Sequence, residues 1–133
     1  RVAAQAGAEG LFGDPAFRRR FAAAELALAA IETSEQRILG ALAAGRNPGP
    51  LASMLKVGAT ETMQRIDELA VEAAGPYGLV QQMETRRPGA VVPPVGPAHS
   101  LTAMPRYLND RAASIYGGSN EIQRNLLAKL LGL

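Results

Sequence analysis

The segment from Asp14 to Ala44 constrains the fold most, because after Pro15 it contains no proline and only one glycine, Gly40. Asp14 followed by Pro15 is typical of an N-cap and a first helical residue. An apolar seam then recurs at steps of four and three residues: Phe17, Phe21, Ala24, Leu28, Ile31, Glu35, Ile38 and Leu42. This spacing predicts one helix about 45 Å long at 1.5 Å per residue, with a face suited to a helical bundle.

Two charged features of this first helix have both a functional and a structural explanation. Glu35 interrupts the seam and could be a functional carboxylate, although a salt bridge or a place at the edge of the seam is the more ordinary explanation. Arg18 to Arg20 could hold a phosphate, but a solvated face with nearby carboxylate partners is favoured. Neither feature identifies a site by its pattern alone.

A second long helix is expected from residue 51 to residue 74, after the turn GRNPGP at residues 45–50. Gly58 and Ala59 lie in its middle and indicate close approach of a neighbouring helix. A short turn between two long helices implies that they pack antiparallel. Its expected inner stripe is Leu51, Leu55, Gly58, Thr62, Ile66, Leu69 and Ala73.

Residues 85–100, TRRPGAVVPPVGPAHS, have no helical period and hold four prolines, which predicts an extended surface loop. Three valines in this stretch could form a short edge strand, although Pro93 and Pro94 argue against the interior of a sheet. His99 stands alone, so we expect no metal site. A third helix is expected to begin at Thr102 or Ala103, with a face of Tyr107, Leu108, Arg111, Ala112 and Ile115.

The end of the chain combines a glycine hinge with a capped helix. Gly117 and Gly118 break the helical pattern, Ser119 and Asn120 offer cap side chains, and Glu121 lies in the first turn of the next helix. Such a helix N-terminus is suited to an anion or to the polar edge of a ligand. The apolar residues that follow at helical spacing are Ile122, Leu126, Leu127, Leu130 and Leu131.

The composition fits one all-α domain and excludes several classes of function. The chain has 133 residues with 47% hydrophobic content but only 5% aromatic residues, so alanine and leucine must build most of a closely packed helical core. Zero cysteines exclude disulfides, and a net charge of +2 does not indicate a nucleic-acid partner. No apolar run approaches the ~20 residues that span a bilayer. Residues 1–13 form an expected partly ordered lead-in of what we expect to be the C-terminal part of a longer chain.

The sequence IYGGSNEIQRN at residues 115–125 resembles the C-terminal signature of the acyl-CoA dehydrogenase family, Ile-Tyr-Glu-Gly-Thr-x-x-Ile-Gln-Arg. The resemblance implies an all-α, four-helix up-and-down bundle like the C-terminal domain of that family. It also implies FAD-dependent α,β-dehydrogenation of an acyl-CoA thioester. The hinge would then lie against FAD and the thioester, with Tyr116, Gly118, Ser119 and Glu121 as cofactor-binding residues. Gly117 occupies the usual position of the catalytic base, so this chain supplies no catalytic residue that we can name.

A second cofactor contact follows from the same resemblance. The family carries a Gln-x-x-Gly-Gly-x-Gly turn that approaches the FAD of a neighbouring subunit. Here Glu72 stands at the glutamine position, Gly75 and Gly78 match glycines, and Pro76 replaces the middle glycine. Proline removes a flexible point and an N–H donor, so the contact would differ in detail.

The missing base leaves two explanations open. Either a carboxylate elsewhere in the parent chain takes the proton, or this chain belongs to a non-catalytic subunit of a mixed complex. The expected partners are an acyl-CoA substrate, an electron-accepting flavoprotein or similar, and further copies in a homodimer or homotetramer, in the cytoplasm and without nucleic acid or membrane. The rivals are a non-enzymatic helical oligomerisation module and a DNA-associated flavoprotein of the same superfamily. Asp110-Arg111 resembles an acidic-basic pair before the family hinge, for which structural ion pairing is the simpler role.

Overall fold

The computed structural model describes residues 10–130, 132 and 133, and the first part of the expected lead-in lies outside them. Four α-helices make up most of the described chain: α2 at Pro15–Ala43, α3 at Leu51–Ala74, α4 at Ser100–Asp110 and α5 at Asn120–Leu130. Short 3₁₀ helices join them, namely η1 at Leu11–Gly13, η2 at Gly75–Leu79 and η3 at Arg111–Ser114. The described residues contain no strand, so the predicted all-α fold with four helices is confirmed.

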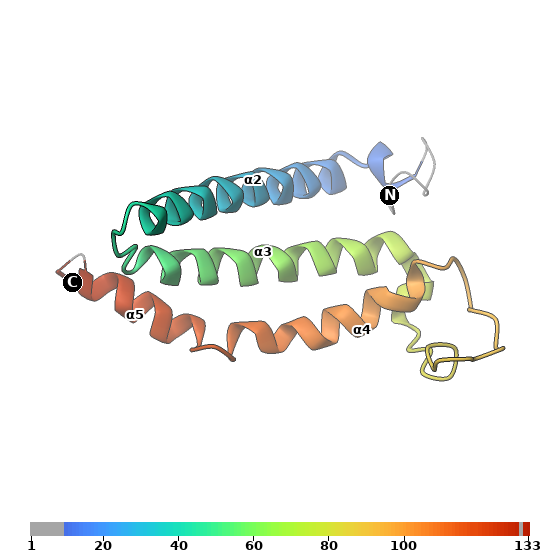
Figure 1. Cartoon of the computed structure of the whole chain (residues 1–133). Helices are drawn as coiled ribbons and strands as arrows, with labels where there is room; N and C mark the ends of the chain where they lie inside the picture. The colour runs from blue at the N-terminus through green and yellow to red at the C-terminus, as the bar shows by residue number, and fades with distance from the viewer. Residues whose placement is uncertain (1–9, 131) are drawn as a thin grey trace.

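The central helix of the fold is α3 (Figure 1). Helix α2 runs antiparallel along one side of α3, and α4 and α5 follow each other end to end along the opposite side. The chain therefore makes three passes, up, down and up, and the last pass is broken between η3 and α5. This arrangement places the glycine hinge beside α3 rather than at an end of the fold.

The boundaries of the two long helices agree with the sequence pattern. The Asp14 carboxylate accepts a hydrogen bond from the backbone N–H of Ala16 at 2.8 Å and so caps α2, as predicted. The Asn47 side chain accepts one from the N–H of Gly49 at 2.8 Å and shapes the turn before α3. Helix α4 begins slightly before the predicted start, because the Ser100 hydroxyl donates to the carbonyl of Pro97 at 2.7 Å and fixes the turn there.

The apolar core is small and lies where α2 begins. Phe17 is almost fully buried and packs with Ala24 and Leu69. The rings of Phe12 and Phe17 meet edge to face with centroids 5.7 Å apart, and Phe12 meets Phe21 in the same way at 5.1 Å. The end of the lead-in that is described thus contributes an aromatic side chain to the core.

The contact seam of α2 differs from the predicted one. Leu28, Glu35 and Leu42 are exposed, whereas the residues one position earlier, Ala27, Ser34 and Ala41, are partly buried. The other predicted seam positions are buried or partly buried. Small side chains allow α2 and α3 to approach closely, so the helix turns these residues inward in place of the leucines. A Cβ at Gly58 would lie 3.8 Å from Ile31 Cγ1, which is consistent with the close approach predicted there.

The predicted apolar stripes of the other helices are also partly wrong. On α3, Leu51 and Ile66 are exposed, while Thr62 and Leu69 are buried. The predicted faces of α4 and α5 lie mostly on the surface, with Leu108, Ala112, Ile115, Ile122, Leu126 and Leu130 exposed. The reason is that α3 meets α4, η3 and α5 through polar side chains instead: Lys56, Thr60, Gln64, Asp67 and Glu68.

The proline-rich connection is a loop without a strand, as the prolines predicted. The Gln82 side chain holds it like a strand pairing, donating to the carbonyl of Val95 at 3.0 Å and accepting from its N–H at 2.7 Å. The Tyr77 ring lies against Gly96, where a Cβ would come within 2.3 Å of the ring. The buried Gln82 side chain and the partly exposed Tyr77 ring therefore position the loop.

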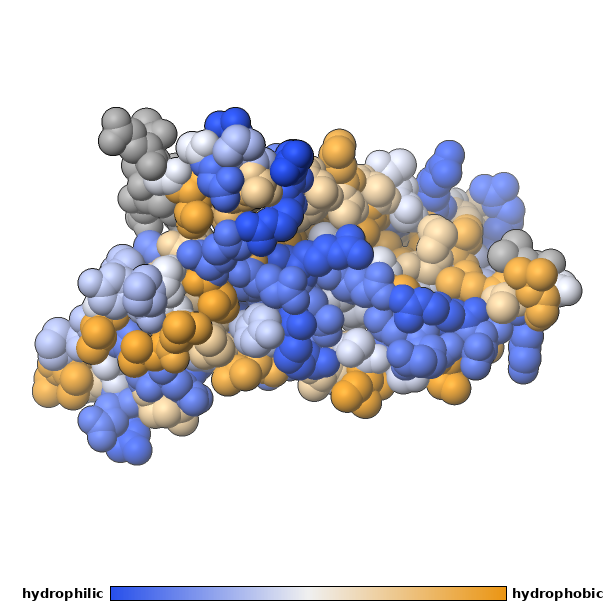
Figure 2. Space-filling view, turned by 180° about the vertical axis from the view of Figure 1, so that it is seen from behind, coloured by the Kyte–Doolittle hydropathy of each residue, from blue (hydrophilic) through white to orange (hydrophobic). Residues whose placement is uncertain are grey.

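The surface is divided between a polar band and apolar regions. Figure 2 shows a band of polar side chains along the middle of one face, with apolar ones at both ends of the molecule and along its lower edge. Val91 of the loop is 96% exposed, and Leu79 is 72% exposed. Among the described residues, no helix combines the length and the apolar character that crossing a membrane requires.

Candidate functional site

The glycine hinge leaves the end of α4 through η3 and enters α5. Gly117 and Gly118 have φ angles of 67° and 84°, a region that other residues seldom adopt. The Gln123 side chain donates to the carbonyl of Gly117 at 3.2 Å and closes the turn. The Ser119 hydroxyl accepts from the N–H of Ile122 at 3.4 Å, so Ser119 caps α5 as predicted.

Asn120 anchors the hinge to the central helix. Its side chain is 3% exposed, and its Oδ1 atom accepts hydrogen bonds from Lys56 Nζ at 2.8 Å and from Thr60 Oγ1 at 3.2 Å. Lys56 and Thr60 are one helical turn apart on α3, so both face α5. A buried amide with two donors is a directional contact, and it fixes how far along α3 the hinge lies.

The hinge presents a bare surface to the outside. A Cβ on Gly117 would meet no atom within 4 Å, and Tyr116 beside it is 57% exposed. A Cβ on Gly118, by contrast, would lie 2.6 Å from Gln123 Nε2. Open space in front of Gly117 and an exposed aromatic ring suit the close approach of a flat ligand to the backbone.

The charge at the start of α5 belongs to the cap. The hydrogen bond of the Glu121 carboxylate with the backbone N–H of the same residue lowers the pKa of Glu121. The Ser119 hydroxyl, Arg124 and Lys56 lower this pKa as well. The carboxylate therefore stays ionised at neutral pH and faces the positive end of the α5 dipole. Arg124 of α5 forms an ion pair with Glu61 of α3, which is a second polar contact between the two helices.

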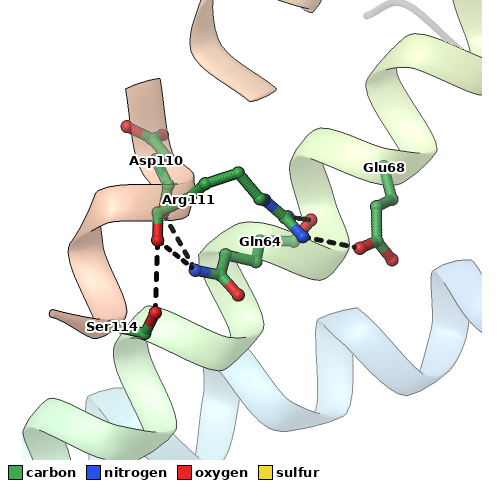
Figure 3. Close-up of polar contacts among 5 residues, drawn as sticks. All are labelled: Gln64, Glu68, Asp110, Arg111 and Ser114. Atoms are coloured by element: carbon green, nitrogen blue, oxygen red, sulfur yellow. Dashed lines mark hydrogen bonds and ion pairs between the residues drawn. The ribbon is translucent and has the colours of Figure 1, made fainter. Parts of the chain in front are cut away.

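A polar network holds η3 against α3 (Figure 3). The Gln64 amide donates to the carbonyl of Asp110 at 3.0 Å, and Arg111 donates to Glu68 at 3.2 Å and to the carbonyl of Gln64 at 3.2 Å. The Arg111 guanidinium also lies 4.5 Å from the centroid of the Tyr107 ring. The structural ion pairing expected for Asp110-Arg111 is therefore made by Arg111, with Glu68 as its partner.

Asp110 instead lies beside a second buried carboxyl group. Burial first, and then the hydrogen bond and charge of Asp110, together raise the pKa of Asp67 to about 6, against the opposing charges of Arg106 and Arg111. The residue exposure of Asp67 is 2%. Arg106 Nε lies 3.8 Å from its Oδ1 atom, while its Oδ2 atom is buried without a hydrogen-bond partner. This pair of acids is a place where protonation changes the contact between α3 and α4.

The turn after α3 forms the second predicted site. Both oxygens of Glu72 accept from Arg20 of α2, at 2.6 and 2.7 Å, so this carboxylate is already engaged. Glu72, Gly75 and Pro76 line an open hollow of about 630 Å³. Gly78 does not line this hollow but packs against α3, since a Cβ there would come within 2.6 Å of the carbonyl oxygen of Val71. Any side chain at residue 78 would therefore push the turn away from α3.

The two predicted sets of cofactor residues do not meet within one chain. Tyr116, Gly118, Ser119 and Glu121 belong to the hinge, which is anchored at Thr60 of α3. The turn begins at the far end of α3, about 22 Å away at 1.5 Å per residue. This separation is compatible with the expectation that the turn approaches the cofactor of a neighbouring subunit.

Sequence patterns missed the polar anchors of the site. Lys56, Thr60 and Gln64 repeat at steps of four residues on α3, which could have signalled a second packed face. We interpreted Asn120 only as a cap residue, although it also joins α5 to α3. Asp67 gave no local signal, because a carboxyl pair forms only when α4 returns to α3.

One comparison with known proteins identifies the family. A family model described as the C-terminal domain of acyl-CoA dehydrogenase matches residues 1–132. Neither a curated protein nor a solved structure gives a significant match to the chain. The match covers all but the last residue, and it agrees with the hinge signature and the all-α fold. The chain therefore belongs to the acyl-CoA dehydrogenase family, in the part that forms the C-terminal domain.

Proposed function

We propose that this chain is the C-terminal domain of an FAD-dependent acyl-CoA dehydrogenase that introduces an α,β double bond into an acyl-CoA thioester. The observation that carries the proposal is the bare glycine hinge at Gly117, held to α3 by a buried asparagine in a chain of this family. The domain helps to bind FAD and to form the oligomer. An electron-accepting flavoprotein or a similar protein would then reoxidise the enzyme.

The residues present fit a flavin, because the hinge has no Cβ at Gly117 and opens directly to solvent. FAD, when bound, supplies the acceptor for the β-hydride. Tyr116 and the backbone from Gly118 to Ser119 would hold its edge, with Glu121 keeping the α5 cap charged. Glu72, Gly75 and Pro76 would line the hollow used by the cofactor of a neighbouring subunit.

The proton step needs a group that this hinge does not contain. Removal of the α-proton requires a carboxylate within hydrogen-bond reach of the substrate, and Gly117 has no side chain. We propose that a carboxylate elsewhere in the full-length protein is the base. Neither described acid at the hinge or the seam suits this role, since Glu121 serves the α5 cap and Glu35 is exposed on α2.

The second candidate, a non-catalytic subunit of a mixed complex, is favoured by the same glycine. A subunit without a base could still complete the oligomer and its partner's cofactor site. In that case the purified full-length protein would be inert towards acyl-CoA by itself and would become active only with a second subunit.

The test is flavin content and acyl-CoA oxidation by the full-length protein, measured with an artificial electron acceptor. If the base lies elsewhere in the protein, the unmodified enzyme is active. Gly117→Glu then lowers the rate, because a second carboxylate raises the pKa of the first. Gly45→Glu is the matched control, since Gly45 has a φ of 68° and also has open space around its Cβ position. Its rate should be unchanged.

Three outcomes would count against the proposal. A protein that is purified without flavin and does not take up FAD is not a flavoenzyme. An active enzyme that loses its rate when Glu35 or Glu121 is changed to glutamine, while its flavin stays bound, has its base in this chain. Equal loss of rate in Gly117→Glu and Gly45→Glu would show only backbone strain and would remove the argument from the hinge.

A further inference from the structure

A cleft that neither predicted site uses is lined by α4 and by the segment after η2. In Figure 1 that segment lies at the loop end of the molecule. Its volume is about 370 Å³, at the small end of the range for ligand pockets. Gln81, Met83 and Arg86 line it from the segment, and Thr102 and Arg106 are among the residues that line it from α4. Two elements that are separated in the sequence thus bring two arginines to the lining of one hollow.

The charge of this cleft is one-sided. No acidic side chain lines it, and residues 85–109 contain no aspartate or glutamate. Glu84 is close in sequence but does not line the cleft. The contact of Arg106 Nε with the buried Asp67, at 3.8 Å, is long for an ion pair, and the Arg106 side chain remains 66% exposed. No carboxylate lines the cleft opposite Arg86, and the exposed Arg106 meets Asp67 only at this long distance, so the two arginines together attract an anion.

We propose that this cleft binds a small phosphate ester, with Arg86 and Arg106 on the phosphate. A phosphomonoester carries close to two negative charges at neutral pH, which matches two guanidinium groups better than one carboxylate does. Arginine forks present paired N–H donors that fit phosphate oxygens, and the Thr102 hydroxyl adds a further polar group at the rim. Met83 and Leu108 form an apolar wall for the organic part of the ester.

This inference is independent of the proposed function, because it involves neither the hinge nor the turn after α3. Its direct test is calorimetric titration of the full-length protein with phenyl phosphate, and with benzoate as a singly charged analogue. We expect saturable binding of phenyl phosphate and at least roughly tenfold weaker binding of benzoate. Arg86→Gln and Arg106→Gln should each weaken phenyl phosphate binding roughly tenfold or more, as expected for a lost charge-assisted hydrogen bond.

Arg87→Gln is the matched control, since Arg87 is the next residue but does not line the cleft. Its affinity should stay within about twofold of the unmodified protein. Arg86→Gln is the decisive variant, because Arg106 also contacts Asp67 and its loss could disturb the fold. Equal unfolding temperatures of Arg86→Gln and Arg87→Gln would show that only the site has changed.

Vesicles distinguish a soluble ester from a lipid headgroup as the source of the phosphate. A headgroup ligand predicts binding to phosphatidylcholine vesicles that contain phosphatidic acid, loss of this binding in Arg86→Gln, and competition by phenyl phosphate. A soluble ligand predicts phenyl phosphate binding without vesicle binding. The proposal is wrong if neither probe binds more tightly than about 10 mM, or if Arg87→Gln weakens binding as much as Arg86→Gln does.

Discussion

Replacing Asp67 by asparagine should stabilise the protein at pH 8 and have little effect at pH 4. Asp67 is buried beside Asp110, and its pKa in the folded state is raised from 3.8 to about 6. Below pH 3.8 the carboxyl is protonated in both the folded and the unfolded state, so it does not lower the free energy of unfolding. Between about pH 4 and 6 the unfolded state loses this proton first, so the free energy of unfolding falls as the pH rises. Above pH 6 the buried carboxyl is ionised, and the free energy of unfolding is lowered by the full amount. Asp67→Asn removes this destabilisation.

The size of this effect follows from the pKa difference. A rise from 3.8 to about 6 corresponds to an upper limit of about 3 kcal/mol, at 1.36 kcal/mol for each pKa unit. Water reaches the edge of the contact, since the neighbouring Arg106 side chain is 66% exposed, and the effective dielectric constant is therefore high. The variant also loses the weak pairing with Arg106. We expect a net gain of about 1–2 kcal/mol at pH 8, or roughly 4–8 °C in the unfolding temperature.

The assay is thermal unfolding of both proteins at pH 4, 6 and 8, combined with an NMR titration of the Asp67 carboxyl carbon. Glu68→Gln is the control, because Glu68 is an exposed acid beside Asp67 on α3 and should change stability by no more than about 1 kcal/mol at any pH. Asp110→Asn should lower the pKa of Asp67. A carboxyl that titrates near pH 4, or an Asp67→Asn variant that is equally stabilised at pH 4 and pH 8, would refute the reasoning.

Further predictions concern the hinge. Asn120→Ala should destabilise the protein by about 1–3 kcal/mol in chemical denaturation, because the partly buried Lys56 loses its hydrogen-bond acceptor. Asn125→Ala, on the exposed side of α5, is the control and should change stability by less than about 0.5 kcal/mol. Gly118→Ala should cost about 1–2 kcal/mol for its φ of 84° and more for the contact with Gln123; an unchanged unfolding midpoint would show that the hinge backbone can rearrange.

The long helices were predictable because residues at their ends set where they begin and stop. Asp14 and Pro15 begin α2, and the turn at residues 45–50 separates it from α3. The facing of the helices was less predictable. Apolar periodicity predicts Leu28 as a seam residue, but the small side chain of Ala27 lets α3 come closer. Apolar periodicity shows that a helix has one face turned towards the core. It does not decide which of two neighbouring residues lies at the centre of that face.

The hinge itself was predictable, but its attachment was not. Two consecutive glycines, Gly117 and Gly118, predict a break in the helical pattern, and their positive φ angles confirm it. The contact between Lys56 and Asn120 joins residues 64 positions apart, and no local pattern signals it. Polar residues such as Gln64 are assigned to solvent when only apolar periodicity is considered. A helix packed on two sides can use its second side for hydrogen bonds.

Polar contacts of α3 explain how the hinge keeps its position although the apolar residues of α5 do not hold it. Ile122, Leu126 and Leu130 are 55%, 47% and 63% exposed, so their burial contributes little to the contact with α3. Four acids of α3 instead meet arginines from each flanking element: Glu61 with Arg124, Asp67 with Arg106, Glu68 with Arg111 and Glu72 with Arg20. The pairs of Glu61, Glu68 and Glu72 are exposed and contribute little stability each, but their hydrogen bonds are directional and favour one register. Apolar packing would allow α5 to shift along α3, whereas the hydrogen bonds of Asn120 with Lys56 and Thr60 hold it in one place. The polar face of α3 buries little apolar surface, but its hydrogen bonds fix the position of Gly117 relative to the bundle.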